Sequence, residues 1–335
     1  MFHPATRCLL LATATALSAL SQNATPIPST IVGAGYLFPA PINVAPGQVI
    51  TIFATGVGAT LTAPVFAGPG TLPTSLAGIS VTIQQGKNIP APILEVSPVS
   101  SCGSGCAAIT AITLQIPYSL VTLCSPSLTV CSNSNVLVQT NLFVTENGVA
   151  GNVTALNPLP DHVHILTTCD TVLPGASGIA PLGGLPCQAE ATHADGTLVS
   201  VVSPANTGEE LVAYAVGLGA TSPAASAGKP ATQPIPTVET FMLDFNYHSN
   251  ARPSQPSKSI LPTDTVPTTP LFSGLTPGYP GLYQINFIVP GVPGGLPACA
   301  AGQGPSVIAT NLTVSVGGLS SFDGAGICVL LPEGP

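Results

Sequence analysis

The sequence predicts an all-β protein made of two tandem antiparallel β-sandwich domains. Three observations support this fold class. Glycine and proline interrupt the whole chain, apolar and polar residues alternate over short runs, and one set of sequence landmarks occurs twice in the same order. Short alternating runs separated by turn residues are typical of sandwiches.

The composition fits two folded domains. The chain has 335 residues, which suits about two domains of ordinary size. Charged residues make up only 5% of it, yet its mean hydropathy is +0.52, so it has enough apolar side chains to form cores. With 37 prolines and 35 glycines, short strands and many turns are favoured over long helices.

The charge of the chain excludes two classes of partner. The net charge is −8, and the 5 lysines and arginines are scattered. No basic patch can neutralise several phosphates, so we expect no binding to nucleic acid. Attraction to anionic lipid is unsupported for the same reason.

The first residues resemble a secretory signal peptide, which we place at residues 1–21. Arg7 precedes an apolar run over residues 8–20, and small residues at Ala19 and Ser21 suit cleavage after Ser21. The run is too short for a membrane anchor, which needs about 20 apolar residues. We expect no later membrane span, and a location that is secreted, periplasmic or at the cell surface.

The cysteines predict a disulfide framework. Of 9 cysteines, Cys8 lies in the predicted signal, which leaves eight in an exported chain. Proximity along the chain favours the pairs Cys102–Cys106, Cys124–Cys131, Cys169–Cys187 and Cys299–Cys328. A zinc site formed by the first four of these cysteines is the alternative, and export argues against it.

An internal repeat defines the predicted domains. Residues 47–60 align without a gap to residues 208–221, and both blocks end in Gly-x-Gly-Ala-Thr. Residues 114–117 correspond to 287–290, and 140–148 correspond to 310–318 with one residue of slack. The prediction is therefore a first domain over residues 22–150, a connecting segment over 151–206 and a second domain over 207–335.

Strands are predicted at the landmarks of both copies. Ile79, Val81 and Ile83 alternate with polar residues, as in a half-buried strand, and Asn147-Gly148 is a strong hairpin signal. The predicted strands cover residues 48–57, 79–84, 108–116, 136–146, 238–247, 282–289, 308–316 and 327–331.

Two segments lie outside this pattern. The connecting segment is too long for a plain linker, and we expect one or two of its strands to cross between the sandwiches or to belong to them. Residues 31–38 form a short apolar run near the mature N-terminus. They are either the first strand of the first domain or an arm that pairs with another copy.

The second copy resembles a known domain family. The strings "GEELVAYAVGLGATSP", "PGLYQINFIVP" and "LTVSVGG" are similar to an uncharacterised C-terminal domain of acidobacterial (Solibacter-type) exported proteins. The resemblance covers residues 196–320 well, and residues 44–150 look like a diverged copy. It implies an immunoglobulin-like β-sandwich and carries over no activity and no catalytic residues. The large upstream domain that usual members carry is not part of this sequence.

Catalytic motifs are weak in this sequence. The Gly-x-Gly pairs lack the third glycine and the lysine of nucleotide loops, so we interpret them as bends that need positive φ. No Gly-x-Ser-x-Gly string is present. Glu209 and Glu210 are adjacent in a predicted strand and point to opposite faces, which does not suit a glycosidase. We therefore expect a protein that is not an enzyme and that needs no cofactor.

Two weaker sites are candidates. His162 and His164 alternate on one strand face, and with His193 and Asp195 they could hold a metal ion, although surface or interdomain positions explain them as well. Tyr279, in a Pro-Gly-Tyr-Pro-Gly loop, is the best exposed candidate for ligand binding.

The expected function is therefore structural. We expect an adhesion, matrix or envelope protein that assembles with itself by strand addition or binds other envelope proteins or polysaccharide. A polysaccharide- or protein-binding module is the alternative, and a secreted hydrolase ranks third.

Overall fold

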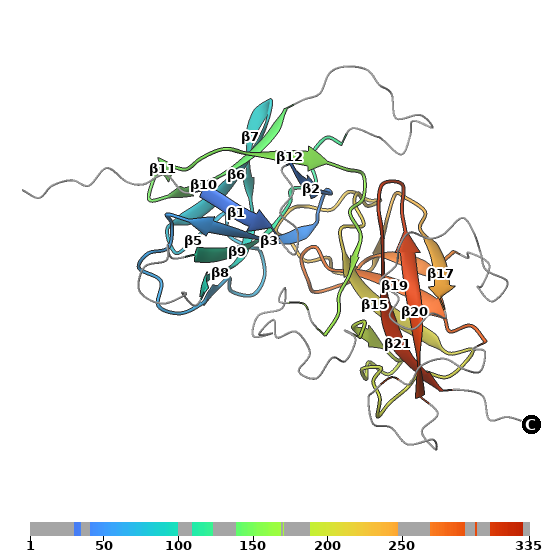
Figure 1. Ribbon diagram of the computed structural model, residues 1–335. Helices are drawn as coiled ribbons and strands as arrows, with labels where there is room; N and C mark the ends of the chain where they lie inside the picture. The colour runs from blue at the N-terminus through green and yellow to red at the C-terminus, as the bar shows by residue number, and fades with distance from the viewer. Residues whose placement is uncertain are drawn as a thin grey trace, which may run out of the picture.

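The computed structural model describes residues 30–34, 41–99, 109–122, 139–168, 170, 188–246, 269–291, 299 and 309–330. Every regular element among these residues is a β-strand, which confirms the all-β prediction (Figure 1). Within the same residues, no helix is long and apolar enough to cross a membrane. The predicted signal peptide lies outside the described residues.

The first half of the chain forms two sheets. The first has the order β1-β3-β9-β8-β4, and the second has the order β2-β12-β10-β6-β5, with β7 and β11 as further partners. The strands are β1 (Thr30–Ala34), β2 (Ile42–Val44), β3 (Val49–Thr55), β4 (Val65–Phe66), β5 (Ser75–Leu76), β6 (Ile79–Gln85), β7 (Lys87–Ala91), β8 (Ile93–Val99), β9 (Ile109–Gln115), β10 (Thr140–Glu146), β11 (Val149–Ala150) and β12 (Thr154–Pro158).

The second half also forms two sheets. Their orders are β13-β15-β19-β18-β16, with β14 as a further partner of β15, and β17-β20-β21. The strands are β13 (His164–Ile165), β14 (Ala191–Thr192), β15 (Glu210–Val216), β16 (Ile235–Pro236), β17 (Met242–Asn246), β18 (Phe272–Leu275), β19 (Tyr283–Ile288), β20 (Ala309–Gly317) and β21 (Phe322–Leu330).

Burial follows the alternation that the sequence shows. In β6, Ile79, Val81 and Ile83 are fully buried, whereas the residues between them are half-buried. One apolar cluster contains residues between Ile42 and Leu156, and a second contains residues between Val163 and Val329. Each half therefore encloses its own core between its sheets, as expected of sandwich-like packing. The immunoglobulin-like assignment stays a prediction.

The aligned blocks of the repeat occupy equivalent places. β3 and β15 are strands of equal length, and in each the first residue pairs with the last residue of its neighbour: Val49 with Gln115 and Glu210 with Ile288. The glycines that follow each strand have positive φ, as the sequence predicted. The Asn147-Gly148 hairpin also forms, between β10 and β11.

The connecting segment contributes strands to both halves. β12 pairs with β10 and β2 of the first half, while β13 and β14 pair with β15 of the second. Only residues 159–163 separate β12 from β13, and Pro160, Asp161 and Val163 among them are buried. The passage between the halves is therefore part of the packed structure.

The N-terminal segment pairs within its own chain. β1 lies antiparallel to β3 at the edge of the first sheet, with Thr30 opposite Thr55. Of the two predicted arrangements for residues 31–38, the structure has the first-strand arrangement for its described part, residues 30–34.

Buried polar contacts join the two halves. Gln115 is fully buried; its Oε1 accepts a hydrogen bond from the Gly228 amide (2.6 Å), and its Nε2 donates to the Gly47 carbonyl (3.3 Å). The Leu72 amide donates to the Gly228 carbonyl at 2.8 Å. A small apolar cluster around Val49, Leu166 and Val216 also draws on both halves. We call these contacts the joint.

Candidate functional site

The described part of the connecting segment carries three histidines, and each has a different environment. The Nδ1 of His162 accepts a hydrogen bond from Nε2 of Gln48 (3.0 Å). Burial, the largest influence, and the nearby charge of His164 lower the pKa of His162. His162 is therefore a neutral residue of the joint, since Gln48 belongs to the first half.

His164 lies between two carboxylates. Its Nδ1 donates to Oδ2 of Asp323 (2.8 Å), and its Nε2 donates to Oδ1 of Asp170 (2.9 Å). Burial alone would lower the pKa of His164, but the hydrogen bonds and charges of Asp170 and Asp323 outweigh it and raise the pKa to about 10. His164 is thus an imidazolium at neutral pH, which leaves neither ring nitrogen free for a metal ion.

The two partners of His164 are themselves held by the backbone. Oδ2 of Asp170 accepts hydrogen bonds from the amide and hydroxyl of Thr167, at 2.6 and 2.9 Å. Oδ2 of Asp323 also accepts from the Ile165 amide at 3.1 Å. The hydrogen bond between His164 and Asp323 therefore ties β13 to β21, two strands that lie far apart in the sequence.

A second pair of acids lies beside this cluster. Asp161 is fully buried, and its oxygens accept hydrogen bonds from the amides of Ser320 and Ser321 (both 2.8 Å) and from the Ser321 hydroxyl (2.7 Å). Glu239 is 7% exposed. Burial is the main cause that raises the pKa of Glu239 to about 8, and the charge of Asp161 and a hydrogen bond to it raise the pKa further. Glu239 is thus protonated at neutral pH.

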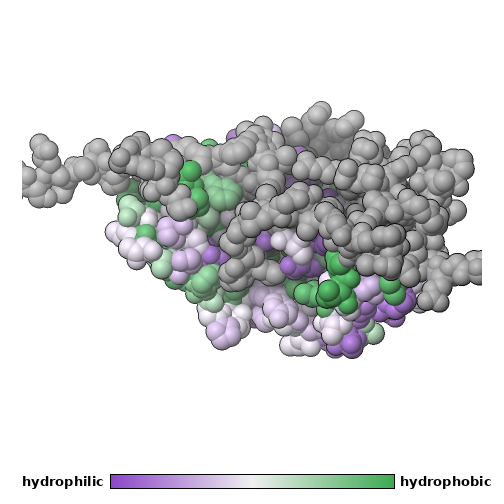
Figure 2. All heavy atoms as spheres, turned by 60° about the horizontal axis from the view of Figure 1, so that its bottom comes forward, coloured by the Kyte–Doolittle hydropathy of each residue, from purple (hydrophilic) through white to green (hydrophobic). Residues whose placement is uncertain are grey.

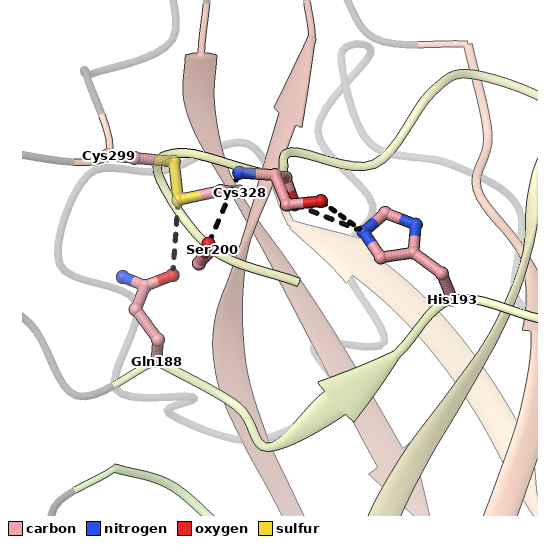
Figure 3. Close-up of a disulfide and its surroundings, with 6 residues drawn as sticks. Gln188, His193, Ser200, Cys299 and Cys328 are labelled. Carbon is pink, nitrogen blue, oxygen red and sulfur yellow. Dashed lines mark hydrogen bonds between the residues drawn. A yellow bond between two sulfur atoms is a disulfide. The ribbon is translucent and has the colours of Figure 1, made fainter. Parts of the chain in front are cut away.

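His193 has a carboxylate on one side and a serine on the other. Its Nδ1 lies 2.5 Å from Oε1 of Glu209. Its Nε2 lies 3.1 Å from the carbonyl oxygen and 3.3 Å from the hydroxyl of Ser203. These last two contacts are the dashed lines that end on the His193 ring in Figure 3.

The predicted metal cluster is not assembled in the part of the chain that the structure describes. There, no group of three or more histidine, cysteine, aspartate and glutamate side chains could hold an ion. His164 bonds to two carboxylates, and His193 bonds to Glu209. Asp195 instead accepts hydrogen bonds from the amide and hydroxyl of Thr197, at 2.9 and 2.7 Å, and these bonds lower its pKa and close a turn.

One predicted disulfide is present. Cys299 and Cys328 are bonded, with their Cα atoms 5.6 Å apart (Figure 3). It ties β21 to a residue 29 positions earlier. The other predicted pairs, Cys102–Cys106, Cys124–Cys131 and Cys169–Cys187, lie outside the described residues and stay predictions.

Tyr279 lies on the surface, with 61% of its area exposed. It is one of several large apolar or aromatic side chains that are exposed. In the view of Figure 2, green apolar side chains reach the surface in separate places among purple polar ones. The exposure expected for a ligand-binding side chain is therefore present at Tyr279.

Several residues of these clusters were not singled out from the sequence. Asp170, Ser203, Glu239 and Asp323 carry no motif, and the sequence offers Glu209 only as one of two adjacent glutamates that do not suit a glycosidase. The sequence holds one weak signal: a histidine at 193 and an acid at 209 flank a loop that contains Ser200 and Ser203. A turn that returns the chain on itself would bring the three together.

Comparison with known proteins leaves the family open. No model of a protein family matches the chain, and no curated protein matches it. The resemblance to the exported acidobacterial domain therefore stays a prediction.

Proposed function

We propose that this chain is an exported structural or adhesion protein of the cell envelope or extracellular matrix. The observation that supports this proposal most is the joint. Gln115 of the first half is fully buried and accepts a hydrogen bond from Gly228 of the second half. Gln48 of the first half donates a hydrogen bond to His162, on the side of the second half. Two halves joined by buried, paired polar groups form a stiff unit, because buried polar groups tolerate little displacement.

The composition of the surface agrees with this role. Charged residues make up only 5% of the chain, and large apolar side chains such as Val202 (94%), Val121 (65%) and Leu319 (65%) are exposed. Such a surface favours association with itself or with other envelope polymers, since few charges oppose contact.

The proposed assembly by strand addition takes a specific form here. Because β1 completes the sheet of its own chain, addition between chains requires β1 to leave its own β3 and to pair with β3 of a neighbour in the same register. This exchange would use the hydrogen bonds that the structure already contains, which is the usual route of strand swapping.

Cell fractionation, sedimentation and electron microscopy test the proposal. We expect the protein in the envelope or medium and expect it to sediment as a concentration-dependent assembly or with envelope polymer. A variant without residues 22–34, which lacks β1 and keeps β2, should lose the assembly. Assembly unchanged in this variant would contradict strand exchange. A protein that stays in the cytoplasm as a monomer would contradict the structural role.

A binding module is the second candidate, and the exposed Tyr279 favours it. Aromatic side chains at the surface stack on sugar rings, and Tyr279 has the required exposure. A glycan array with no hits for the purified protein would remove the polysaccharide form of this candidate.

A further inference from the structure

A surface loop brings a serine, a histidine and a glutamate into line. His193 precedes the loop and follows β14, Ser203 lies within it, and Glu209 directly precedes β15. The three side chains are in contact in the order Ser203 Oγ, His193 Nε2, His193 Nδ1, Glu209 Oε1, with distances of 3.3 and 2.5 Å at the two contacts between residues. We propose that these residues form a nucleophilic site that cleaves uncharged carboxylic esters.

The geometry assigns a role to each member. Glu209 binds one ring nitrogen of His193, so it orients the ring and favours the tautomer with a proton on Nδ1. The other nitrogen, Nε2, then faces the Ser203 hydroxyl as a proton acceptor. A separation of 3.3 Å is long for a finished hydrogen bond, but such contacts shorten when substrate binds.

The surrounding backbone holds the three residues in place. The second oxygen of Glu209 accepts a hydrogen bond from the Asn206 amide at 2.8 Å. Ser200 and Ser203 exchange backbone hydrogen bonds at 2.9 and 3.2 Å, which closes the serine turn. Two residues later, Ala205 bonds to the backbone of β21 at Cys328, and the Cys299–Cys328 disulfide lies beside this contact. A site needs this kind of support to keep its geometry.

The carbonyl of Ser203 makes the site depend on pH. When His193 is protonated, Nε2 donates to this carbonyl (3.1 Å) and cannot accept the serine proton. Burial lowers the pKa of His193, but Glu209, the Ser203 carbonyl and Asp195 together raise it above its usual 6.5. The neutral, competent form therefore gains population as pH rises through this raised value.

The surface around Ser203 indicates the class of substrate. Val202, which directly precedes Ser203, is 94% exposed, and Leu198, in the same loop opposite Thr192, is 61% exposed, so the loop presents apolar side chains. Nearby charges are negative, since Glu209 and Asp195 are the charged groups that act on His193. An uncharged ester with a short apolar acyl group suits both features.

The reaction follows from these roles. Ser203 Oγ attacks the ester carbonyl carbon, and its proton passes to His193 Nε2. The alcohol leaves with that proton when the carbon–oxygen bond breaks, so the acyl group stays on Ser203. Water, deprotonated by His193, then releases the carboxylic acid and restores the serine. Such an activity would contradict the expectation that the chain is not an enzyme.

A fluorophosphonate label and p-nitrophenyl butyrate test the site in the full mature chain. We expect a covalent label on the peptide that contains Ser203 and ester cleavage that rises as pH increases above 6.5. Ser203→Ala should abolish both, whereas Ser226→Ala, at an exposed serine elsewhere, should change neither. His193→Gln should slow labelling at least about a hundredfold.

Glu209→Gln separates catalysis from a purely structural loop contact. Loss of the carboxylate should lower the pKa of His193, so the pH profile should move to lower pH while the rate falls. Circular dichroism checks that each variant is folded. The pH dependence of the wild-type protein tests the proposal even if a variant fails to fold. No label on Ser203 at any pH, or equal labelling of a folded His193→Gln variant, would overturn the proposal.

Discussion

At the scale of residues, His164 and Glu239 are protonated at neutral pH in the folded protein, whereas both would be mostly deprotonated there in the unfolded chain. The pKa of His164 is raised to about 10 because, despite its burial, Asp170 and Asp323 bind both ring nitrogens. Its contribution to stability is fully present below pH 6.5 and is lost as pH rises through 10. The pKa of Glu239 is raised to about 8, mainly by burial and then by Asp161. Its contribution is fully present below pH 4.5 and is lost as pH rises through 8.

These two groups predict stability that falls with rising pH in two overlapping ranges. Each group lowers the free energy of unfolding by up to about 1.4 kcal/mol per pH unit within its range. Glu239→Gln removes the lower range, because an amide can donate to Asp161 at every pH. We expect the variant to lose the decline between pH 4.5 and 6.5 and to keep the decline between pH 8 and 10 that His164 causes. Urea denaturation at a series of pH values measures both.

Glu210→Gln is the matched control, since Glu210 is an exposed glutamate on β15. Its pH profile should follow that of the wild type. If Glu239→Gln also follows the wild type below pH 6.5, then Glu239 is not the proton-binding member of the pair with Asp161.

At the scale of elements, the glycines after β15 decide how closely the connecting segment approaches it. Gly217 has a φ of 80°, and a Cβ there would lie 2.0 Å from the His162 carbonyl oxygen. Gly208, before the same strand, has a φ of 82°, yet a Cβ there would meet nothing within 4 Å. The two positions share their backbone strain and differ in the space around them.

This difference predicts unequal effects of the same substitution. Gly208→Ala should cost only the strain of positive φ, about 1–2 kcal/mol. Gly217→Ala should cost clearly more, because the backbone of residue 162 must move and the hydrogen bond from its amide to Gly217 (2.8 Å) must lengthen. Denaturation midpoints of the two variants compare the costs. Equal midpoints would mean that the backbone around His162 moves away from residue 217 at little cost in free energy.

Strands with a clear pattern in the sequence could be predicted, and strands that depend on pairing with distant residues could not. The strands β3, β6, β9 and β19 have an alternating or duplicated pattern and form near the predicted bounds. β15 forms in the block that aligns with the β3 block of the first copy. The short strands β4, β5, β13 and β14 have two residues each, which is too few to show a period. β21 runs over Phe322–Leu330, longer than the predicted 327–331, because pairing with β20 extends it through glycines.

The side-chain clusters were mostly beyond the reach of sequence patterns. His164 and Asp323 are separated by 159 positions, and Asp161 and Ser321 by 160. Only the folded sheets bring such residues together, so no spacing rule could pair them. The sequence does mark out the histidines of the connecting segment, as metal ligands or as surface or interdomain residues. His162 has an interdomain place, beside Gln48, but no pattern pointed to the carboxylate partners of His164 and His193.

At the scale of the whole molecule, the two halves share a boundary that is packed rather than flexible. β12 of the first half leads within a few buried residues to β13 of the second. In Figure 1 the blue-to-green strands and the yellow-to-red strands form two lobes that meet along this passage. Gln115 lies at the centre of the joint, since it binds Gly228 of the second half and Gly47 of the first.

The joint predicts that the halves unfold together. Gln115→Ala leaves the Gly228 amide and the Gly47 carbonyl without their partner in a buried place, which costs about 1–3 kcal/mol for each unsatisfied group. This cost falls on the coupling between halves, because each core keeps its own apolar contacts. We therefore expect one calorimetric transition for the wild type and two separated transitions, or a broadened one, for Gln115→Ala. Gln84→Ala, at an exposed glutamine of β6, should keep the single transition. If both variants unfold in one transition with equal shifts in transition temperature, the coupling between the halves does not depend on Gln115. The stiffness proposed for this protein must then come from the apolar contacts around Val49 and Val216.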